Sequence, residues 1–220
     1  MKQSIKLMLF ITAFALTACN KTTPIVEEEG FDYGKVVNNK YSNRFFNIEM
    51  DVPAGWNVQD QEQREALMKQ GQEAVAGDNA IMKAKLKASE VNSANLLTVY
   101  QHEVGAAVDY NANFMLVAEN LKNFPSIKSG GQYLDNAKKL IKNSPANISQ
   151  MDDSYTKKVI NGIEFYTMNV TMNVQNIPIH QMYMATVKDG FALGFIYSYM
   201  TKEQKTDLEN VTNSIKPYRR

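Results

Sequence analysis

The chain has 220 residues, a formal net charge of +1 at pH 7 and 44% hydrophobic residues. This length suits one globular domain, and the apolar content excludes an intrinsically disordered chain. The balanced charge gives no electrostatic basis for nucleic acid binding or for a polybasic membrane patch, and a single cysteine excludes an internal disulfide.

The N-terminus has the layout of a secretory signal over residues 1–18. Met1–Lys6 is a short basic start, Leu7–Leu16 is an uncharged and mostly apolar run, and Ala18 is a small residue before a cleavage site. The apolar run is too short to cross a bilayer as a permanent helix. Loss of Lys2 and Lys6 with the signal changes the formal net charge from +1 to −1.

The signal ends in Leu16, Thr17, Ala18 and Cys19, which resemble a bacterial lipobox. The resemblance implies that the Cys19 thiol takes a diacylglycerol, that the signal is cut before Cys19, and that the new amine receives an acyl chain such as palmitate. Two or three chains hold a protein stably in a membrane, whereas one holds it only marginally. We therefore expect a lipid-anchored protein of the cell envelope with no other cofactor. The alternative is a soluble protein in which Cys19 is a free thiol.

The residue after the cysteine bears on which membrane holds the anchor. In the enterobacterial pattern an aspartate at that position favours retention in the inner membrane. This chain has Asn20 instead. We therefore expect the outer membrane, with the domain facing the periplasm, rather than the inner membrane.

A flexible tether is predicted to follow, over residues 19–34. Pro24, the acidic run Glu27–Glu29 and the glycines Gly30 and Gly34 all oppose packed structure. A single folded domain is then expected over residues 35–220.

The domain is predicted to open with a hairpin over Lys35–Val52. Val36 and Val37 begin the first strand, and Ser42–Asn43 form the turn. The second strand alternates, so that its apolar side chains share one face. These side chains are Phe46, Ile48, Met50 and Val52.

Residues 41–56, with the sequence YSNRFFNIEMDVPAGW, resemble the opening hairpin of the PsbP/Mog1-like (DUF1795-type) domains. In those domains an aromatic-containing strand runs into a Pro-x-Gly-Trp corner, and we expect Trp56 to pack over the end of the sheet. The resemblance implies an α+β fold: an antiparallel sheet of about six or more strands with helices on both faces. That superfamily includes photosystem II subunits, a nuclear-transport cofactor and many lipoproteins of unknown role, so it does not fix the function.

The middle of the chain alternates helices and strands. Apolar periodicity predicts a helix over Gln61–Ala76, and Asp78 or Asn79 can cap a second helix as far as Leu86. Alternating lysines leave an extended segment as the alternative for the second helix. Later predictions are strands over Leu96–Val104 and Phe114–Val117 and a helix over Gln132–Asn143, with a helix into Leu121 as the alternative to the second strand.

The last third is predicted to be an antiparallel meander followed by a helix. Two turn signals for tight hairpins, Asn161–Gly162 and Asp189–Gly190, separate apolar runs of strand length. A capping box from Thr201 to Gln204 opens the final helix. The predicted strands are Thr156–Ile160, Ile163–Val174, Ile179–Lys188 and Phe191–Met200.

Methionine and tyrosine side chains concentrate in this meander, which suggests a binding face. Adaptable methionines and amphipathic tyrosines suit an apolar ligand or a protein partner. The alternative is that they fill the core. The candidate residues are Tyr166, Met168, Met172, Met182, Met184, Tyr183, Tyr197 and Tyr199.

No catalytic or phosphate-binding motif appears in the sequence. His102 and His180 are far apart, although Glu103 or Asp109 could join them across a sheet. Metal sites need several converging ligands, so we expect no metal and no catalytic residues. A serine nucleophile paired with either histidine stays open, because triads assemble in space.

These observations leave three hypotheses. The first is a non-enzymatic envelope lipoprotein that binds an unknown envelope protein, or supports envelope assembly, through a sheet edge or the Met/Tyr face. The second is a carrier or sensor of a small apolar ligand, which requires an enclosed cavity lined by those residues. The third is a hydrolase, which requires a histidine hydrogen-bonded to a serine or an acid.

The anchor predicts the behaviour of the Cys19→Ser variant. Without the thiol no diacylglycerol can be attached, so we expect the variant to leave the membrane fraction in cell fractionation. A variant that still sediments with membranes as fully as the wild type would contradict the lipid anchor.

Overall fold

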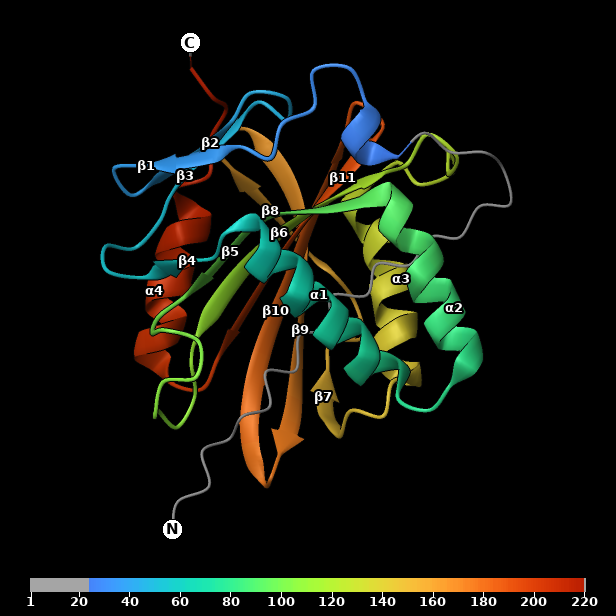
Figure 1. Ribbon diagram of the computed structural model, residues 1–220, viewed down its shortest axis with the longest axis vertical. Coiled ribbons are helices and arrows are strands. Elements are labelled where there is room, and N and C mark those ends of the chain that lie inside the picture. The colour runs from blue at the N-terminus through green and yellow to red at the C-terminus, as the bar shows by residue number, and fades with distance from the viewer. Residues whose placement is uncertain (1–23, 220) are drawn as a thin grey trace.

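The computed structural model describes residues 24–219 (Figure 1). The signal and the lipobox residues Leu16, Thr17, Ala18 and Cys19 lie outside the described residues. Among residues 24–219, none of the helices has the length and apolar character that crossing a bilayer requires.

An eight-stranded antiparallel sheet forms the centre of the fold. Its order is β4-β5-β6-β11-β10-β9-β7, and β8 also pairs with β9. The predicted α+β class, with an antiparallel sheet, is therefore confirmed. The strands are β4 Asn57–Val58, β5 Ser93–Tyr100, β6 Asn113–Asn120, β7 Ile148–Met151, β8 Thr156–Ile160, β9 Ile163–Val174, β10 Ile177–Lys188 and β11 Phe191–Tyr199.

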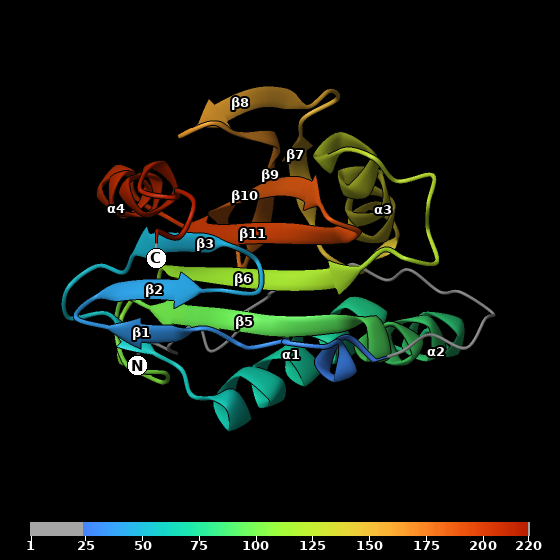
Figure 2. The same ribbon diagram turned by 90° about the horizontal axis from the view of Figure 1, so that it is seen from above.

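Helices cover both faces of this sheet, as Figure 1 and Figure 2 show. On one face, a core cluster joins the sheet to α1 (Gln61–Ala76), α2 (Ala80–Ser89) and α3 (Gly130–Asn143). On the other face, a second cluster joins it to α4 (Lys202–Asn213) and to a small three-stranded sheet. That small sheet consists of β1 Lys35–Val37, β2 Lys40–Asn43 and β3 Ile48–Asp51.

Local signals set most of these elements. Asp60 and Gln63 form a capping box at the start of α1, and Thr201 and Gln204 form one at the start of α4. The side chain of Asn79 caps α2, which confirms the helix and excludes the extended alternative. The turn at Asn161–Gly162, like the one at Asp189–Gly190, has positive φ at both residues, as tight hairpin turns require.

The opening hairpin differs from the prediction, because Ser42 and Asn43 belong to strand β2. Asn38 and Asn39 make the first turn instead, with φ of 51° and 57°. The Asn43 side chain is fully buried, where it accepts a hydrogen bond from the Phe46 amide at 2.9 Å and so shapes the second turn. The predicted apolar face of the next strand is nevertheless buried throughout, from Phe46 to Val52.

Residues 24–34 pack on the domain, so the predicted tether is wrong for this stretch. A short 3-10 helix, η1 (Ile25–Glu27), buries Ile25 to 1% exposure within the second core cluster. Glu28 pairs with Lys122 and accepts a hydrogen bond from Asn120 at 2.8 Å. The free energy gained by burying the large apolar side chain of Ile25 stabilises this packed arrangement, although the composition of the stretch favours turns.

Trp56 and Gly130 complete the comparison with the sequence. Trp56 packs against the second core cluster and is half-buried there. Helix α3 begins at Gly130, two residues before the predicted start at Gln132, and a Cβ at Gly130 would come within 2.0 Å of the Ala185 carbonyl oxygen. This close approach of α3 to β10 requires glycine.

The packing of η1 predicts the effect of substitutions in it. Ile25→Ala should lower the free energy of unfolding by about 2–4 kcal/mol, because it removes a fully buried side chain. Its neighbour Val26 is 49% exposed. Val26→Ala should therefore change the free energy of unfolding by less than about 0.5 kcal/mol. Urea unfolding of both variants measures the difference. Equal, small effects would mean that residues 24–34 are not part of the folded domain.

Candidate functional site

The Met/Tyr residues of the meander do not form one face. Met168, Met172 and Tyr183 belong to the core beneath α1–α3, with Tyr166 packed against it. Met184 and Tyr197 belong to the opposite core beneath α4, with Met182 and Tyr199 at its margin. Met168, Met172, Met184, Tyr183 and Tyr197 are each exposed by 1% or less. The possible binding face is therefore not formed, and the core alternative holds for these five side chains, which pack on both sides of the sheet, while Tyr166, Met182 and Tyr199 are half-buried.

The two histidines lie apart and neither has a catalytic partner in the described chain. His102 is exposed in the loop after β5, since that strand ends at Tyr100 and not at Val104. His180 stacks on Tyr199 with ring centroids 5.3 Å apart, and its Nδ1 lies 3.1 Å from the Thr171 hydroxyl. Within residues 24–219 there is no group of His, Cys, Asp and Glu side chains that could hold a metal ion.

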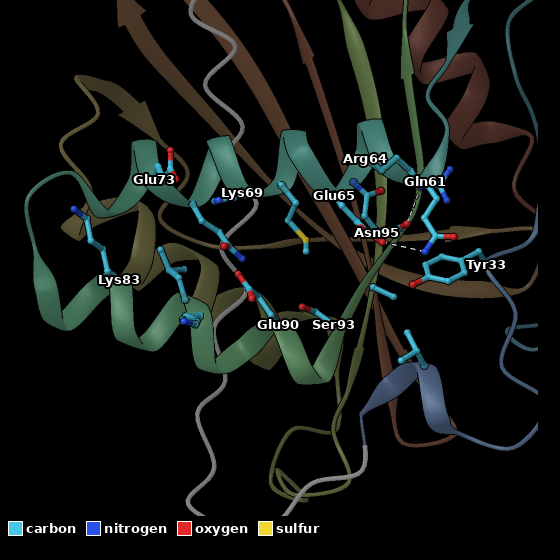
Figure 3. A pocket seen from close by; sticks show the side chains of 16 residues that line it. Tyr33, Gln61, Arg64, Glu65, Lys69, Glu73, Lys83, Glu90, Ser93 and Asn95 are labelled. Atoms are coloured by element: carbon cyan, nitrogen blue, oxygen red, sulfur yellow. Dashed lines mark hydrogen bonds between the residues drawn. The ribbon is translucent and has the colours of Figure 1, made fainter.

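A groove of about 660 Å³ lies between α1 and α2 (Figure 3), and we call it the α1–α2 groove. The two helices form its walls, the first residues of β5 form its floor, and η1 and Tyr33 lie at one end. Its lining residues are Val26, Tyr33, Gln61, Arg64, Glu65, Met68, Lys69, Gln72, Glu73, Lys83, Leu86, Lys87, Glu90, Ser93, Ala94 and Asn95.

The periodicity of α1 explains which of its side chains reach the groove. Leu67, Gly71 and Val75 are buried at helical spacing and hold α1 against the core. Arg64 and Met68 border this stripe and are half-buried. They are therefore turned partly toward the sheet, whereas Glu65 and Lys69 are exposed at the rim.

Arg64 is fixed by backbone carbonyl groups rather than by a carboxylate. Its Nε donates to the Asn95 carbonyl oxygen at 3.0 Å, and its Nη1 donates to the Gln59 carbonyl oxygen at 2.9 Å. The guanidinium carbon also lies 5.7 Å from the centre of the Tyr33 ring. No ion pair within residues 24–219 neutralises this cation.

Burial shifts both ionisable groups at this end of the groove. It lowers the pKa of the Arg64 guanidinium from its usual value, and arginine nevertheless stays charged in proteins. Burial also raises the pKa of the Tyr33 phenol, an effect to which the nearby Glu65 charge adds. Tyr33 is therefore neutral at pH 7 and presents its ring and hydroxyl to the groove.

Charged side chains of both signs line the rest of the groove. Lys69, Lys83 and Lys87 are exposed, as are Glu65, Glu73 and Glu90. Figure 3 places Glu73 and Lys83 at the end where α1 turns into α2, and Arg64, Gln61 and Tyr33 at the other end. None of these charges is joined by an ion pair within the described part of the chain. The half-buried Met68 adds apolar surface between them, whereas the lining residues Leu86 and Ala94 are only 2% and 4% exposed.

Sequence reasoning did not find this groove. The sequence predicted α1 and α2 but not how the two helices lie against each other and against β5. The best available signal was Arg64, a charged residue on the border of the apolar stripe formed by Leu67, Gly71 and Val75. A long cation at such a position reaches along the helix to the neighbouring backbone.

No protein-family model matches this chain, and the search of curated proteins found no match either. Among solved structures, the cyanobacterial PsbP protein CyanoP from Synechocystis sp. PCC 6803 is similar, at 12% identity and a TM-score of 0.44 over 81% of this chain and 91% of that one. LpqN, involved in cell envelope biogenesis of Mycobacterium tuberculosis, is similar at 14% identity and a TM-score of 0.43. The match covers 77% of this chain and 83% of LpqN.

A protein from Bacteroides thetaiotaomicron VPI-5482 is similar at 12% identity and a TM-score of 0.42, over 82% of this chain. This chain spans about half of that protein, 48% of its length. All three TM-scores lie below 0.5, so the architecture and the groove described above stand on the elements of this chain itself.

The contacts of Arg64 predict its contribution to stability. Arg64→Leu leaves the Asn95 and Gln59 carbonyl groups without these donors, so the free energy of unfolding should fall by about 1–3 kcal/mol. Lys69→Leu, five residues further along α1 in the same groove, removes no hydrogen bond within the described chain. It should change the free energy of unfolding by less than about 0.5 kcal/mol. Chemical denaturation of both variants provides the measurement. Indistinguishable variants would show that Arg64 is not fixed as described.

Proposed function

We propose that this chain is a non-enzymatic binding module of the bacterial cell envelope, held to the membrane by lipid on Cys19, and that it binds an envelope protein in the α1–α2 groove. The observation that carries the proposal is Arg64, a half-buried cation held by two carbonyl groups and left without a carboxylate partner. The Asp60 and Glu65 charges act on this cation but form no ion pair with it. A fixed cation without an ion pair beside apolar surface is typical of recognition sites.

The proposed anchor would keep this groove near the membrane. Five residue steps separate Cys19 from Pro24, so even a fully extended chain spans at most about 18 Å between them. The next residues form η1, whose Val26 lines the groove. On this proposal the groove faces partners at the membrane surface. Asn20 supports the outer membrane, with the domain facing the periplasm.

The structure favours this function over the two alternatives. A carrier of an apolar ligand required an enclosed cavity lined by the Met and Tyr side chains, and those side chains are packed in the two cores. The groove, in contrast, has a rim of charged residues. A hydrolase required a histidine hydrogen-bonded to a serine or an acid, a contact that neither His102 nor His180 makes in the described chain.

Photo-crosslinking in intact cells tests the proposed function. A photoreactive amino acid at Lys69, in the groove, should give a reproducible adduct with an envelope protein. The same amino acid at Lys202, an exposed lysine on α4 over the opposite face of the sheet, serves as the matched control. Adducts of the same yield and identity at both positions, or at Lys202 alone, would contradict the groove as the binding site.

A further inference from the structure

We infer that the occupant of the α1–α2 groove is an extended peptide segment of the partner, which adds to the outer edge of β5 and places a carboxylate on Arg64. This inference rests on the proposed function, because it names the kind of partner that the groove takes. Two independent observations carry it: an incomplete sheet edge in the groove floor and the hydrogen-bonding state of Arg64.

The edge strand β4 covers only the end of β5. β4 has two residues, and its pairs are Asn57 with Tyr100 and Val58 with Val99. One more hydrogen bond follows, from the Gln59 amide to the Thr98 carbonyl oxygen at 2.9 Å. No strand of residues 24–219 pairs with this side of β5 from Ser93 to Leu97, although β6 pairs with the other side.

This stretch of the edge is unpaired, although Ala94 to Leu97 are each exposed by 5% or less and its pairing with β6 shifts register between Asn95 and Leu97. Ser93, Ala94 and Asn95 are lining residues of the groove, and α1 runs past them as its wall. Unpaired sheet edges have backbone donors and acceptors that can accept another strand. An extended peptide lying in the groove would continue the sheet where β4 stops, which is a common mode of peptide recognition.

Arg64 now occupies part of that edge. Its Nε donates to the Asn95 carbonyl oxygen, as a neighbouring strand would. A carbonyl oxygen can accept two hydrogen bonds, so a peptide amide can join or replace this contact. Arg64 therefore protects the edge in the free protein and does not permanently block it.

Arg64 also has donors left for the peptide. A guanidinium has five N–H groups, and two of them are used by the Asn95 and Gln59 carbonyl oxygens. The others have no acceptor within the described residues. A planar fork with free N–H groups matches a carboxylate, which makes an aspartate, a glutamate or a C-terminal carboxylate the expected partner.

The lining of the groove suits a peptide. Exposed lysines and glutamates and the half-buried Met68 line it. A peptide can match such mixed chemistry, whereas a lipid acyl chain would meet charged rims on both sides.

The test uses the full chain as cells make it, purified in lipid nanodiscs, with a displayed library of short random peptides as the probe. Selected peptides should share an acidic residue. In the protein, Arg64→Gln should weaken binding of a selected peptide by about tenfold or more, as expected for the loss of a charge-assisted hydrogen bond. Replacing the acidic residue of the peptide by its amide should weaken binding to the wild type similarly, and this arm needs no protein variant.

The matched control is Arg44→Gln. Arg44 also lies over an aromatic ring, that of Tyr218 at 5.8 Å, and it does not line the groove. This variant should bind the peptide as the wild type does. Arg64→Lys, which keeps the charge but not the fork, should bind with intermediate affinity.

Amide hydrogen exchange distinguishes strand addition from other binding. The peptide should slow exchange within residues 93–97, and Arg44→Gln should not alter this effect. Selected peptides that lack acidic residues, or that bind without slowing exchange at residues 93–97, would overturn the inference.

The outcome in cells separates the two proposals. If the crosslinker at Lys69 captures a phospholipid or another small molecule and no protein, the peptide inference and the proposed function both fail. If it captures a protein through a segment that binds without an acidic residue, the carboxylate assignment fails while the proposed function stands. If Lys69 captures nothing, both fail.

Discussion

The constraint on which the rest of the structure depends is the burial of both faces of the central strands. Every residue of β6 is buried, and so is β11 from Phe191 to Ser198. Strands of this kind cannot face water on either side, so the chain must supply two covering layers. α1, α2 and α3 supply one, and α4 with the small sheet supplies the other. Even the buried carboxyl of Glu119 on β6 takes part, because it accepts a hydrogen bond from Tyr133 of α3 at 2.8 Å.

The same constraint determines where the protein can meet other molecules. Side chains on the faces of the central strands pack the two cores and are not accessible to a partner, whereas the rim, where covering elements meet the edge of the sheet, is accessible. The α1–α2 groove is such a place, since it joins a helix pair to the incompletely paired edge of β5. Arg64 belongs to both, as it starts on α1 and ends on the backbone of β5.

The elements with local signals could be predicted from the sequence, and those set by long-range packing could not. Capping boxes and hairpin turns specify their own positions, as Asp60 and Asn161 show. The segment from Pro24 to Gly34 has the composition of a tether, and only its contact with the distant core reveals that Ile25 is buried.

The sequence could not decide between a binding face and a core for the Met/Tyr residues, for a related reason. When both faces of a strand are apolar, alternation no longer tells an exposed face from a buried one. Met182 and Tyr183 are neighbours in the chain, yet they face opposite cores. The groove was missed because it depends on how α1, α2 and β5 are arranged relative to one another, which no single segment of the sequence encodes.

On the function proposed above, the faces of the central strands are closed and the α1–α2 groove is where this protein meets its partner. Amide hydrogen exchange of the chain in intact envelope preparations, compared with the purified chain, tests it most directly. We predict slower exchange in the envelope for residues 61–76 and 80–97, with little change in α4 or in the β9–β10 turn. Protection concentrated on α4 or on the β9–β10 turn, with none in the groove, would contradict the account.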